Sequence, residues 1–188
     1  STSKASGPFS IPSKILKVFD GFFVPILTTI INKSFKEGVF PSNLKCAKVI
    51  PIFKKGDKTK CPNYRPISLL SNVSKIFERI MYNRLETHLN SNSILYKHQY
   101  GFRKKYSTDL DKNMFACGVF VDLEKAFDTV NHSILLAKLE HCGIRGDINK
   151  WFESYLINCK HFVTIYGFDS DLHDANHGVP QGSVLIPL

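Results

Sequence analysis

The sequence predicts an α+β fold, and two observations support this class. Stretches with apolar residues at helical spacing occur in both halves of the chain, and short runs rich in Val, Ile and Phe lie between turn signals, as is typical of strands. The chain has 188 residues, of which 43% are hydrophobic. This is enough for one sizeable core or for two small lobes.

The first half is expected to contain two helices, one strand and two basic loops. Apolar residues recur at helical spacing over residues 11–36 and again over residues 71–89, which form an amphipathic pattern. The run "AKVIPIF" at 47–53 predicts a strand, and the residues after it, 54–66, predict a basic turn and loop. Residues 99–108, "QYGFRKKYST", predict a basic and aromatic loop.

The second half is expected to combine strands and helices. The expected order is a strand at 117–123, a helix at 132–143, a helix at 147–158 and a strand at 160–167. Asp147 is the expected N-cap of the second of these helices. The turn "GVPQGS" at 178–183 carries glycines that permit a close approach of the backbone.

The charge is distributed unevenly along the chain. The sequence has 25 Lys and Arg against 16 Asp and Glu, a net charge of +9. Residues 1–112 hold 20 basic and 7 acidic side chains, a balance of +13, whereas residues 113–188 hold 5 and 9, a balance of −4. Such a division suits a protein that holds a polyanion near metal-binding carboxylates. A soluble protein with one solvated basic face explains the charge equally well.

The cysteines and the apolar runs indicate the compartment. The five cysteines are odd in number and scattered without a C-x-x-C pair, which is typical of reduced thiols rather than of a disulfide framework. No apolar run reaches the length of a membrane span, and the first residues lack the arrangement of a signal peptide. We therefore expect a nuclear or cytoplasmic protein.

The stretch "GVFVDLEKAFDTVNH" at 118–132 is the main candidate for chemistry. Asp122 ends an apolar run that predicts a strand, and a carboxylate at a strand end can bind a divalent ion. Phe127 follows five residues later, where a flat ring could lie beside whatever the metal holds. Asp128 is expected to be a structural or capping acid rather than a ligand. His173 and His177 have i,i+4 spacing, but we expect them in a loop without a third metal ligand.

Four segments in order resemble reverse transcriptases of non-LTR retrotransposons of the jockey type. They are the long segment from "GVFPSNLKCAKVIPIFKKGD" to "IFERIMYNRL", then "HQYGFRKKYST", "VFVDLEKAFDTVNH" and "HGVPQGSVLIPL". The resemblance covers roughly residues 35–188 and implies the fingers and part of the palm of a right-hand polymerase, with an antiparallel sheet packed with helices. It divides the chain into an N-terminal helical segment at 1–46, a basic fingers-like region at 47–112 and a partial palm at 113–188.

The resemblance implies an RNA-directed DNA polymerase that copies RNA into DNA by two-metal nucleotidyl transfer. Its cofactor would be Mg²⁺, with Mn²⁺ as a substitute, and its partners an RNA template, a DNA primer or RNA–DNA hybrid, and deoxynucleoside triphosphates. Asp122 would be the catalytic metal ligand, together with the backbone carbonyl of Leu123. Phe127 would pack against the sugar and exclude a 2′-hydroxyl.

The resemblance also implies residues that contact nucleotide and template. The nucleotide-binding set is Lys54, Lys55, Arg65, Phe127, Gln181 and Gly182. The template-binding set is Gln99, Arg103, Lys104 and Lys105. Cationic side chains suit phosphate oxygens, and contacts with the template backbone would be independent of sequence.

Two alternatives to an active polymerase domain follow from the same residues. The family's third palm motif, a hairpin with paired aspartates, and its thumb do not occur within residues 1–188, so we expect this chain alone to be catalytically inactive. A non-catalytic, basic nucleic-acid-binding remnant of a retrotransposon is therefore the second hypothesis. A viral RNA-dependent RNA polymerase is the third, and Phe127 disfavours it because such an enzyme needs a polar group facing the 2′-hydroxyl.

Overall fold

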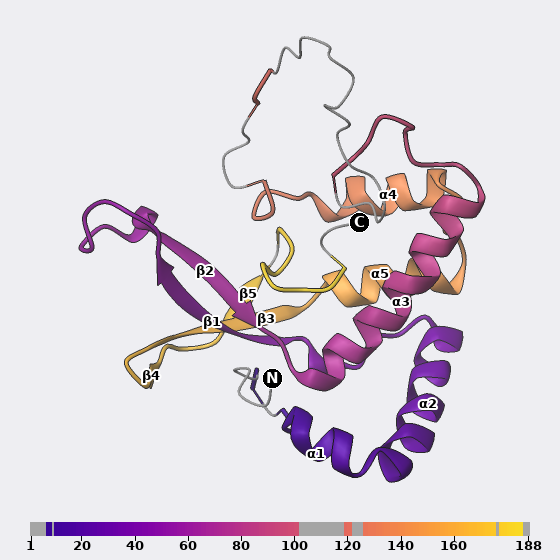
Figure 1. Ribbon diagram of the computed structural model, residues 1–188, viewed down its shortest axis with the longest axis horizontal. Coiled ribbons are helices and arrows are strands. Elements are labelled where there is room, and N and C mark those ends of the chain that lie inside the picture. The colour runs from indigo at the N-terminus through magenta and orange to yellow at the C-terminus, as the bar shows by residue number, and fades with distance from the viewer. Residues whose placement is uncertain (1–6, 9, 102–118, 122–125, 176, 186–188) are drawn as a thin grey trace, which may run out of the picture.

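The computed structural model describes residues 7–8, 10–101, 119–121, 126–175 and 177–185. Figure 1 shows the strands on one side of the molecule and helices α2 to α5 on the other. The described elements are α1 (Ser13–Val18), α2 (Asp20–Glu37), β1 (Cys46–Phe53), β2 (Tyr64–Leu69), α3 (Asn72–Ser91), α4 (His132–His141), α5 (Asp147–Leu156), β3 (Cys159–Ile165), β4 (Phe168–Asp169) and β5 (His173–Ala175), with short 3₁₀ turns at Ser42–Leu44 and Cys61–Asn63. Within these ranges, no helix combines the length and the apolar character needed to cross a membrane.

The sheet is mixed, which corrects the expectation of an antiparallel sheet. Its strand order is β2-β1-β3-β4, and β5 also pairs with β3. β1 and β2 form an antiparallel hairpin, and β4 and β5 run antiparallel to β3. β1 and β3 are parallel, with Lys48 opposite Phe162. Parallel strands need a long crossover connection, and here β2, α3, α4 and α5 lie between the two strands in the chain.

The strongly periodic helices are confirmed, and their ends differ by a few residues. The helix expected at 71–89 is α3, and the helices expected at 132–143 and 147–158 are α4 and α5. The helical pattern at 11–36 is divided at Phe19 into α1 and α2. The strands expected at 47–53 and 160–167 are β1 and β3.

One expectation was wrong in part, and another lies mostly outside the described residues. The loop expected at 54–66 ends early, because β2 begins at Tyr64 and includes Pro66. A proline is tolerated there because β2 is an edge strand of the sheet. The second concerns 117–123, of which only 119–121 are described. These three residues are not part of a strand and their side chains are 81–99% exposed, whereas the other four positions of this expected strand lie outside the described residues.

Helices α3 and α4 each begin with a side chain that caps the first turn. Ser71 accepts a hydrogen bond from the Ser74 N–H at 3.0 Å and caps α3. Asn131 accepts one from the Ile134 N–H at 3.2 Å and caps α4. The expected cap of α5 was wrong by one position, because Gly146, with φ 61°, occupies the cap and Asp147 begins the helix. An aspartate in the first turn still favours the helix through its dipole.

The main core lies between α2, α3 and α5 and is largely aromatic. Trp151 and Phe77 are fully buried in it. The Trp151 ring stacks on that of Tyr155, with centroids 5.6 Å apart and an interplanar angle of 2°. The buried cluster consists of Ile31, Phe35, Phe40, Phe77, Met81, Leu85, Leu89, Ile144, Trp151, Phe152, Tyr155 and Leu156.

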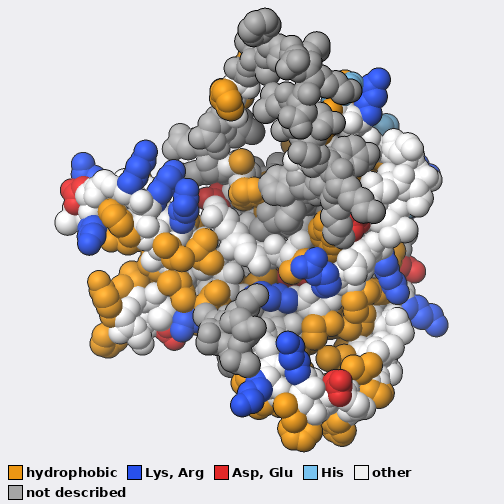
Figure 2. All heavy atoms as spheres, viewed as in Figure 1, with side chains coloured by type: hydrophobic (Ala, Val, Ile, Leu, Met, Phe, Trp, Pro, Cys, Tyr) orange, Lys and Arg blue, Asp and Glu red, His pale blue; other side chains and the backbone are white. Residues whose placement is uncertain are grey.

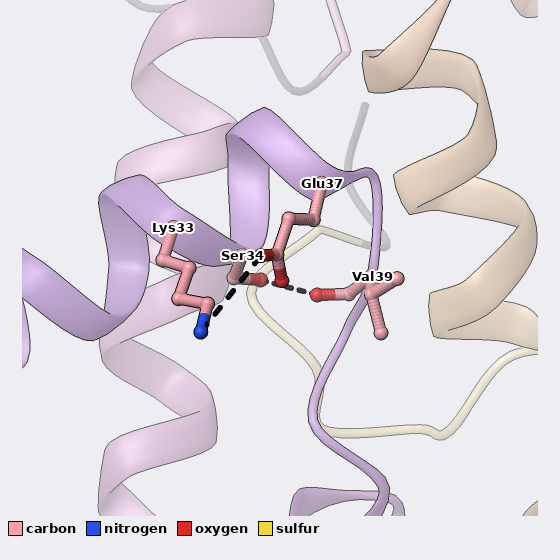
Figure 3. A network of polar contacts seen from close by, with 4 residues as sticks. All are labelled: Lys33, Ser34, Glu37 and Val39. Atoms are coloured by element: carbon pink, nitrogen blue, oxygen red, sulfur yellow. Dashed lines mark hydrogen bonds and ion pairs between the residues drawn. The ribbon is translucent and has the colours of Figure 1, made fainter.

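The end of α2 is joined to α5 through Ser34, and Figure 3 shows the polar contacts of Ser34 and its neighbours at this helix end. Gly38, with φ 67°, ends the helix in the left-handed region, and the Val39 N–H donates to the Ser34 carbonyl at 3.0 Å. The Ser34 hydroxyl donates to the Val39 carbonyl and accepts a hydrogen bond from Trp151 Nε1 at 3.0 Å. The nearby Lys33–Glu37 pair is exposed, with 3.8 Å between the charged atoms, and contributes little.

Replacing the buried Phe77 should test this core. Phe77→Ala should lower the free energy of unfolding by about 3–5 kcal/mol, because a large buried ring is lost and a cavity is left. The matched control is Phe22→Ala, since Phe22 is 66% exposed; it should change stability by less than ~0.5 kcal/mol. Urea unfolding followed by Trp151 fluorescence measures both. Equal losses in the two variants would contradict the placement of the core.

Candidate functional site

The turn at 178–183 packs against the turn that precedes α4. The Val179 N–H donates to the Phe127 carbonyl at 2.9 Å, and the Gly178 N–H donates to the Val130 carbonyl at 3.0 Å. His132 Nε2 lies 2.7 Å from the Gly178 carbonyl oxygen, which can only accept, so this ring nitrogen carries the proton. Two segments that are distant in sequence are thereby joined mainly through their backbones.

Glycine is required at two positions of this turn. Gly178 has φ 76°, and a Cβ added to it would lie 2.7 Å from the Asp128 carbonyl oxygen. Gly182 has φ 134°, and its Cβ would overlap the Ser68 carbonyl oxygen on β2. The close approach expected from these glycines is therefore an approach to the protein's own backbone.

Gln181 connects the turn to both of its neighbours. Its side chain Nε2 donates to Asp128 Oδ1 at 3.1 Å, and its carbonyl accepts from the Ser68 N–H on β2 at 2.8 Å. Asp128 is therefore a structural acid, as expected, although the cap of α4 is Asn131. The result is a hydrogen-bonded junction of the 126–130 turn, the 178–183 turn and the edge strand β2.

A cavity of about 310 Å³ lies between the sheet and this junction. Its exposed wall is mainly apolar, and its polar side chains include those of Ser68, Asp128 and Gln181 as well as two lysines and two histidines. The lining residues are Phe40, Leu44, Lys45, Ala47, Val49, Pro66, Ser68, Leu70, Ser74, Asp128, Tyr155, Leu156, Cys159, Lys160, His161, Val163, Ala175, His177, Gly178, Val179, Pro180 and Gln181. An apolar cavity with a few convergent polar groups is the usual form of a small-molecule site.

The structure gathers some of the expected nucleotide-binding residues and separates others. Phe127, Gln181 and Gly182 lie at the junction, and Phe127 is 38% exposed beside it. Arg65 is exposed on β2, and Pro66 and Ser68 line the cavity from the same strand. Side chains alternate between the faces of a strand, so Arg65 lies on the opposite face.

Four lysines surround the exposed end of the β1–β2 hairpin. Lys54, Lys55, Lys58 and Lys60 are all exposed there, and Figure 2 shows basic side chains gathered over this end of the molecule. We call these four residues the basic hairpin. Among the template candidates, Gln99 is exposed in a turn. Arg103, Lys104, Lys105, Asp122 and Leu123 lie outside the described residues.

The described side chains do not form a metal site by themselves. In the ranges that the structure describes, no group of three or more His, Cys, Asp or Glu side chains could hold a metal ion. His173 was expected in a loop but belongs to strand β5, where its ring lies 6.3 Å from that of His161. Asp128 is engaged by Gln181. A divalent ion at the junction would therefore need carboxylates from beyond these residues.

A buried carboxylate that was not predicted from the sequence contacts the residues after Gly182. Glu78 on α3 is fully buried. Its Oε2 accepts from the Val184 N–H at 2.7 Å and from the Ser183 hydroxyl at 3.0 Å. Its Oε1 accepts from the Tyr155 hydroxyl at 3.1 Å and from the Ser74 hydroxyl at 3.4 Å. The sequence contained a signal, because Glu78 shares the buried stripe of α3 with Ser74, Met81 and Leu85.

Burial affects the ionisation of this group. It raises the pKa of Glu78 above its ordinary value of 4.5, and the hydrogen bonds from Val184, Ser183, Tyr155 and Ser74 offset this in part. Burial, followed by the negative charge of Glu78, raises the pKa of Tyr155 well above 10.0, so its phenol stays neutral. Among the hydrogen-bond partners of Glu78 in the described ranges, Tyr155 is titratable, whereas the others are serine hydroxyls and a backbone N–H.

Comparison with known proteins matches most of this chain to one protein family. Residues 52–188 match the family described as "Reverse transcriptase (RNA-dependent DNA polymerase)". Three similar proteins of Drosophila melanogaster are the probable RNA-directed DNA polymerase from transposon BS, at 33% identity over 98% of this chain, the RNA-directed DNA polymerase from mobile element jockey, at 31% over 98%, and the probable RNA-directed DNA polymerase from transposon X-element, at 31% over 100%. The chain spans 22% of the length of each.

The raised pKa of Glu78 predicts a specific pH dependence of stability. The folded state binds this proton more readily than the unfolded state, so the contribution of Glu78 becomes more favourable as the pH falls through the raised pKa toward 4.5. The difference in unfolding free energy between the parent and Glu78→Gln should therefore shift in favour of the parent over that interval. Urea unfolding at several pH values measures it.

The exposed Glu153 on α5 supplies the control for this measurement. Glu153→Gln removes the same charge, and its stability curve should run parallel to that of the parent. A parent-minus-variant difference for Glu78→Gln that stays constant with pH would contradict the raised pKa of Glu78.

Proposed function

The chain belongs to the reverse transcriptase family, in the group carried by non-LTR mobile elements, and on that premise we propose that residues 1–188 bind the nucleotide and the template in an RNA-directed DNA polymerase. The complete enzyme would copy RNA into DNA by two-metal nucleotidyl transfer. The partners are an RNA template, a DNA primer or RNA–DNA hybrid, and deoxynucleoside triphosphates.

The observation that carries this proposal is the junction of the 126–130 and 178–183 turns. The Val179 N–H is bonded to the Phe127 carbonyl, and the Gln181 amide is bonded to Asp128, the residue after Phe127, so Phe127 and Gln181 belong to one hydrogen-bonded junction, from which Gln181 lines the cavity. We propose that Phe127 packs against the deoxyribose and Gln181 positions the nucleotide, with Gly182 leaving room for it. A bulky ring there would discriminate against a 2′-hydroxyl.

Phosphates and metal are assigned to residues around the junction. Reverse transcriptases generally use divalent metal ions, and we propose Asp122 and the Leu123 carbonyl as ligands for Mg²⁺, which Mn²⁺ could replace. Such an ion neutralises charge on the phosphates. Arg65 faces away from the cavity, and we assign it, with Lys54 and Lys55, to phosphates that lie outside the cavity.

Binding to nucleic acid should depend steeply on salt. The triple variant Arg103→Ala, Lys104→Ala, Lys105→Ala should lower the magnitude of the slope of log affinity against log salt concentration by about 2 to 3, because each lost phosphate contact removes about 0.7 to 0.9. Gln99→Ala should leave this slope unchanged, because a neutral side chain releases no counterion. Titration of an RNA–DNA hybrid at several salt concentrations measures these slopes.

The control removes three basic residues from the acidic half of the chain. Lys138→Ala, Arg145→Ala, Lys150→Ala alters the net charge equally and should leave the slope close to that of the parent. Equal effects of the two triple variants would overturn the template assignment. Salt-dependent binding without any nucleotide incorporation in the assay below would favour the second hypothesis, a non-catalytic remnant.

Sugar discrimination should depend on Phe127. In the jockey polymerase with its matching segment replaced by residues 1–188, Phe127→Val should raise ribonucleotide incorporation by about 10- to 100-fold, the range that an apolar wall gives against an added hydroxyl. Primer extension on an RNA template with Mg²⁺ measures it. Asp122→Asn should abolish extension with both sugars.

Phe168→Val is the matched control, because Phe168 is 81% exposed on β4 and lies outside the junction. It should leave the ratio of the two sugars unchanged. Equal discrimination by Phe127→Val and the unmodified chimera would mean that Phe127 does not contact the sugar. Extension that survives Asp122→Asn would remove Asp122 from the metal site.

A further inference from the structure

A single buried carboxylate joins three parts of the chain that are distant in sequence. Glu78 lies on α3, Tyr155 on α5, and Ser183 and Val184 in the turn that follows Gln181. The Tyr155 hydroxyl also lies 2.9 Å from the Ser183 hydroxyl, which closes the contacts into a ring. All three side chains are buried.

We propose that Glu78 is the positioning residue that holds the 181–185 turn, and through it Gln181, at the edge of the cavity. Its effect on nucleotide binding rests on the function proposed above, whereas its effect on the turn does not. Glu78 itself contacts no nucleotide, and it acts through the backbone of the turn.

The backbone of the turn depends on Glu78 for one of its hydrogen bonds. The Val184 N–H donates to Glu78 Oε2, and the Leu185 N–H donates to the Ser183 hydroxyl, which is itself bonded to Glu78. A backbone N–H can only donate, so it needs an acceptor at this point. An apolar residue in place of Glu78 would fill the core but would leave the Val184 N–H without this partner.

A count of protons shows why a carboxyl group suits this position. The hydroxyls of Tyr155 and Ser183 have one proton each, but three close oxygen contacts join them to each other and to Glu78. Two protons serve two of these contacts when Glu78 is ionised, and a protonated Glu78 supplies the third. A glutamine resembles the protonated form, because its oxygen can accept from Val184 and its amide nitrogen can donate to Tyr155.

The position of Gln181 follows from that of the turn. Gln181 is held by Ser68 on one side and by Asp128 on the other, and the chain reaches the Glu78 contacts two residues later, at Ser183. Gly182, between them, packs directly on the Ser68 carbonyl. If the contacts with Glu78 are lost, the 181–185 turn stays attached to β2 and Asp128 at Gln181, but it is no longer attached to α3 at Ser183 and Val184.

Hydrogen exchange of single amides in the 188-residue chain tests the proposal. Glu78→Met should accelerate exchange of the Val184 amide at least tenfold and that of the Ser68 amide, which donates to Gln181, at least threefold. Glu78→Gln should restore both rates to within threefold of the parent, and the control Glu153→Gln should leave them unchanged. The Leu85 amide in α3 reports whether the core has been altered.

A second variant keeps the proposal falsifiable if Glu78→Met unfolds the core. Ser183→Ala removes one hydroxyl of the ring and leaves the helices unaltered, and it should also accelerate exchange of the Val184 amide, whose own partner is Glu78. A Val184 amide that stays as protected as in the parent, in either variant with an intact core, would overturn the positioning role. Equal acceleration by Glu78→Gln and Glu78→Met would overturn it too.

The chimera with the jockey polymerase separates this inference from the proposed function. Glu78→Met should raise the KM for deoxynucleotides at least fivefold, and Glu78→Gln should change it less than twofold. Faster Val184 exchange together with an unchanged KM would retain Glu78 as the anchor of the turn and reject its link to nucleotide binding. An inactive unmodified chimera would reject the proposed function and leave the exchange result as the test of the anchor.

Discussion

The packing of Trp151 against Tyr155 is the interaction on which the other parts of this molecule depend. Trp151 contacts α2, because its Nε1 donates a hydrogen bond to the Ser34 hydroxyl near the end of that helix. The other side leads to Glu78 on α3 through the Tyr155 hydroxyl. Stacked and edge-on rings give specific geometry as well as buried area, so the direction of the Tyr155 hydroxyl is fixed by the core. The hydrogen bonds around Glu78 therefore depend on the packing of the aromatic core, which orients Tyr155.

Burial of a carboxylate is unfavourable unless neighbouring groups donate hydrogen bonds to it. Glu78 has four hydrogen-bond partners, which is the full acceptor capacity of a carboxylate. This set of contacts stabilises one arrangement, because any other position of the turn would leave the carboxyl group or the Val184 N–H without a partner in the core. This is a reason to regard Glu78 as specifying the conformation of the 181–185 turn rather than as adding general stability.

The sequence predicted features that depend on local patterns and failed on features that depend on distant partners. The helix α3 was predicted because apolar residues repeat along one face of it, and β1 because its apolar run is bounded by turn signals. The parallel pairing of β1 with β3 joins residues about 110 positions apart, such as Lys48 and Phe162, and no local pattern encodes it. Strand β2 was not predicted because it contains Pro66, and a proline is tolerated in this strand only because β2 lies at the edge of the sheet. Phe127 and Gln181 were proposed from motifs, whereas the contacts of Glu78 with Ser183 and Val184 join residues more than 100 positions apart and have no local pattern.

The residues proposed to contact nucleotide depend on residues that would not. Gly178 and Gly182 allow the turn to lie against the backbones of Asp128 and Ser68, where a Cβ would not fit. Backbone hydrogen bonds then fix the distance between the two turns, and Glu78 fixes the following residues from below. Because an error of about 1 Å in the placement of a reacting group can lower a rate by roughly 100-fold, the rigid parts of this junction matter as much as the side chains at its edge. A change at Gly182 or Glu78 is thus expected to alter the junction as a unit, whereas a change at Phe127 alters only what the junction recognises.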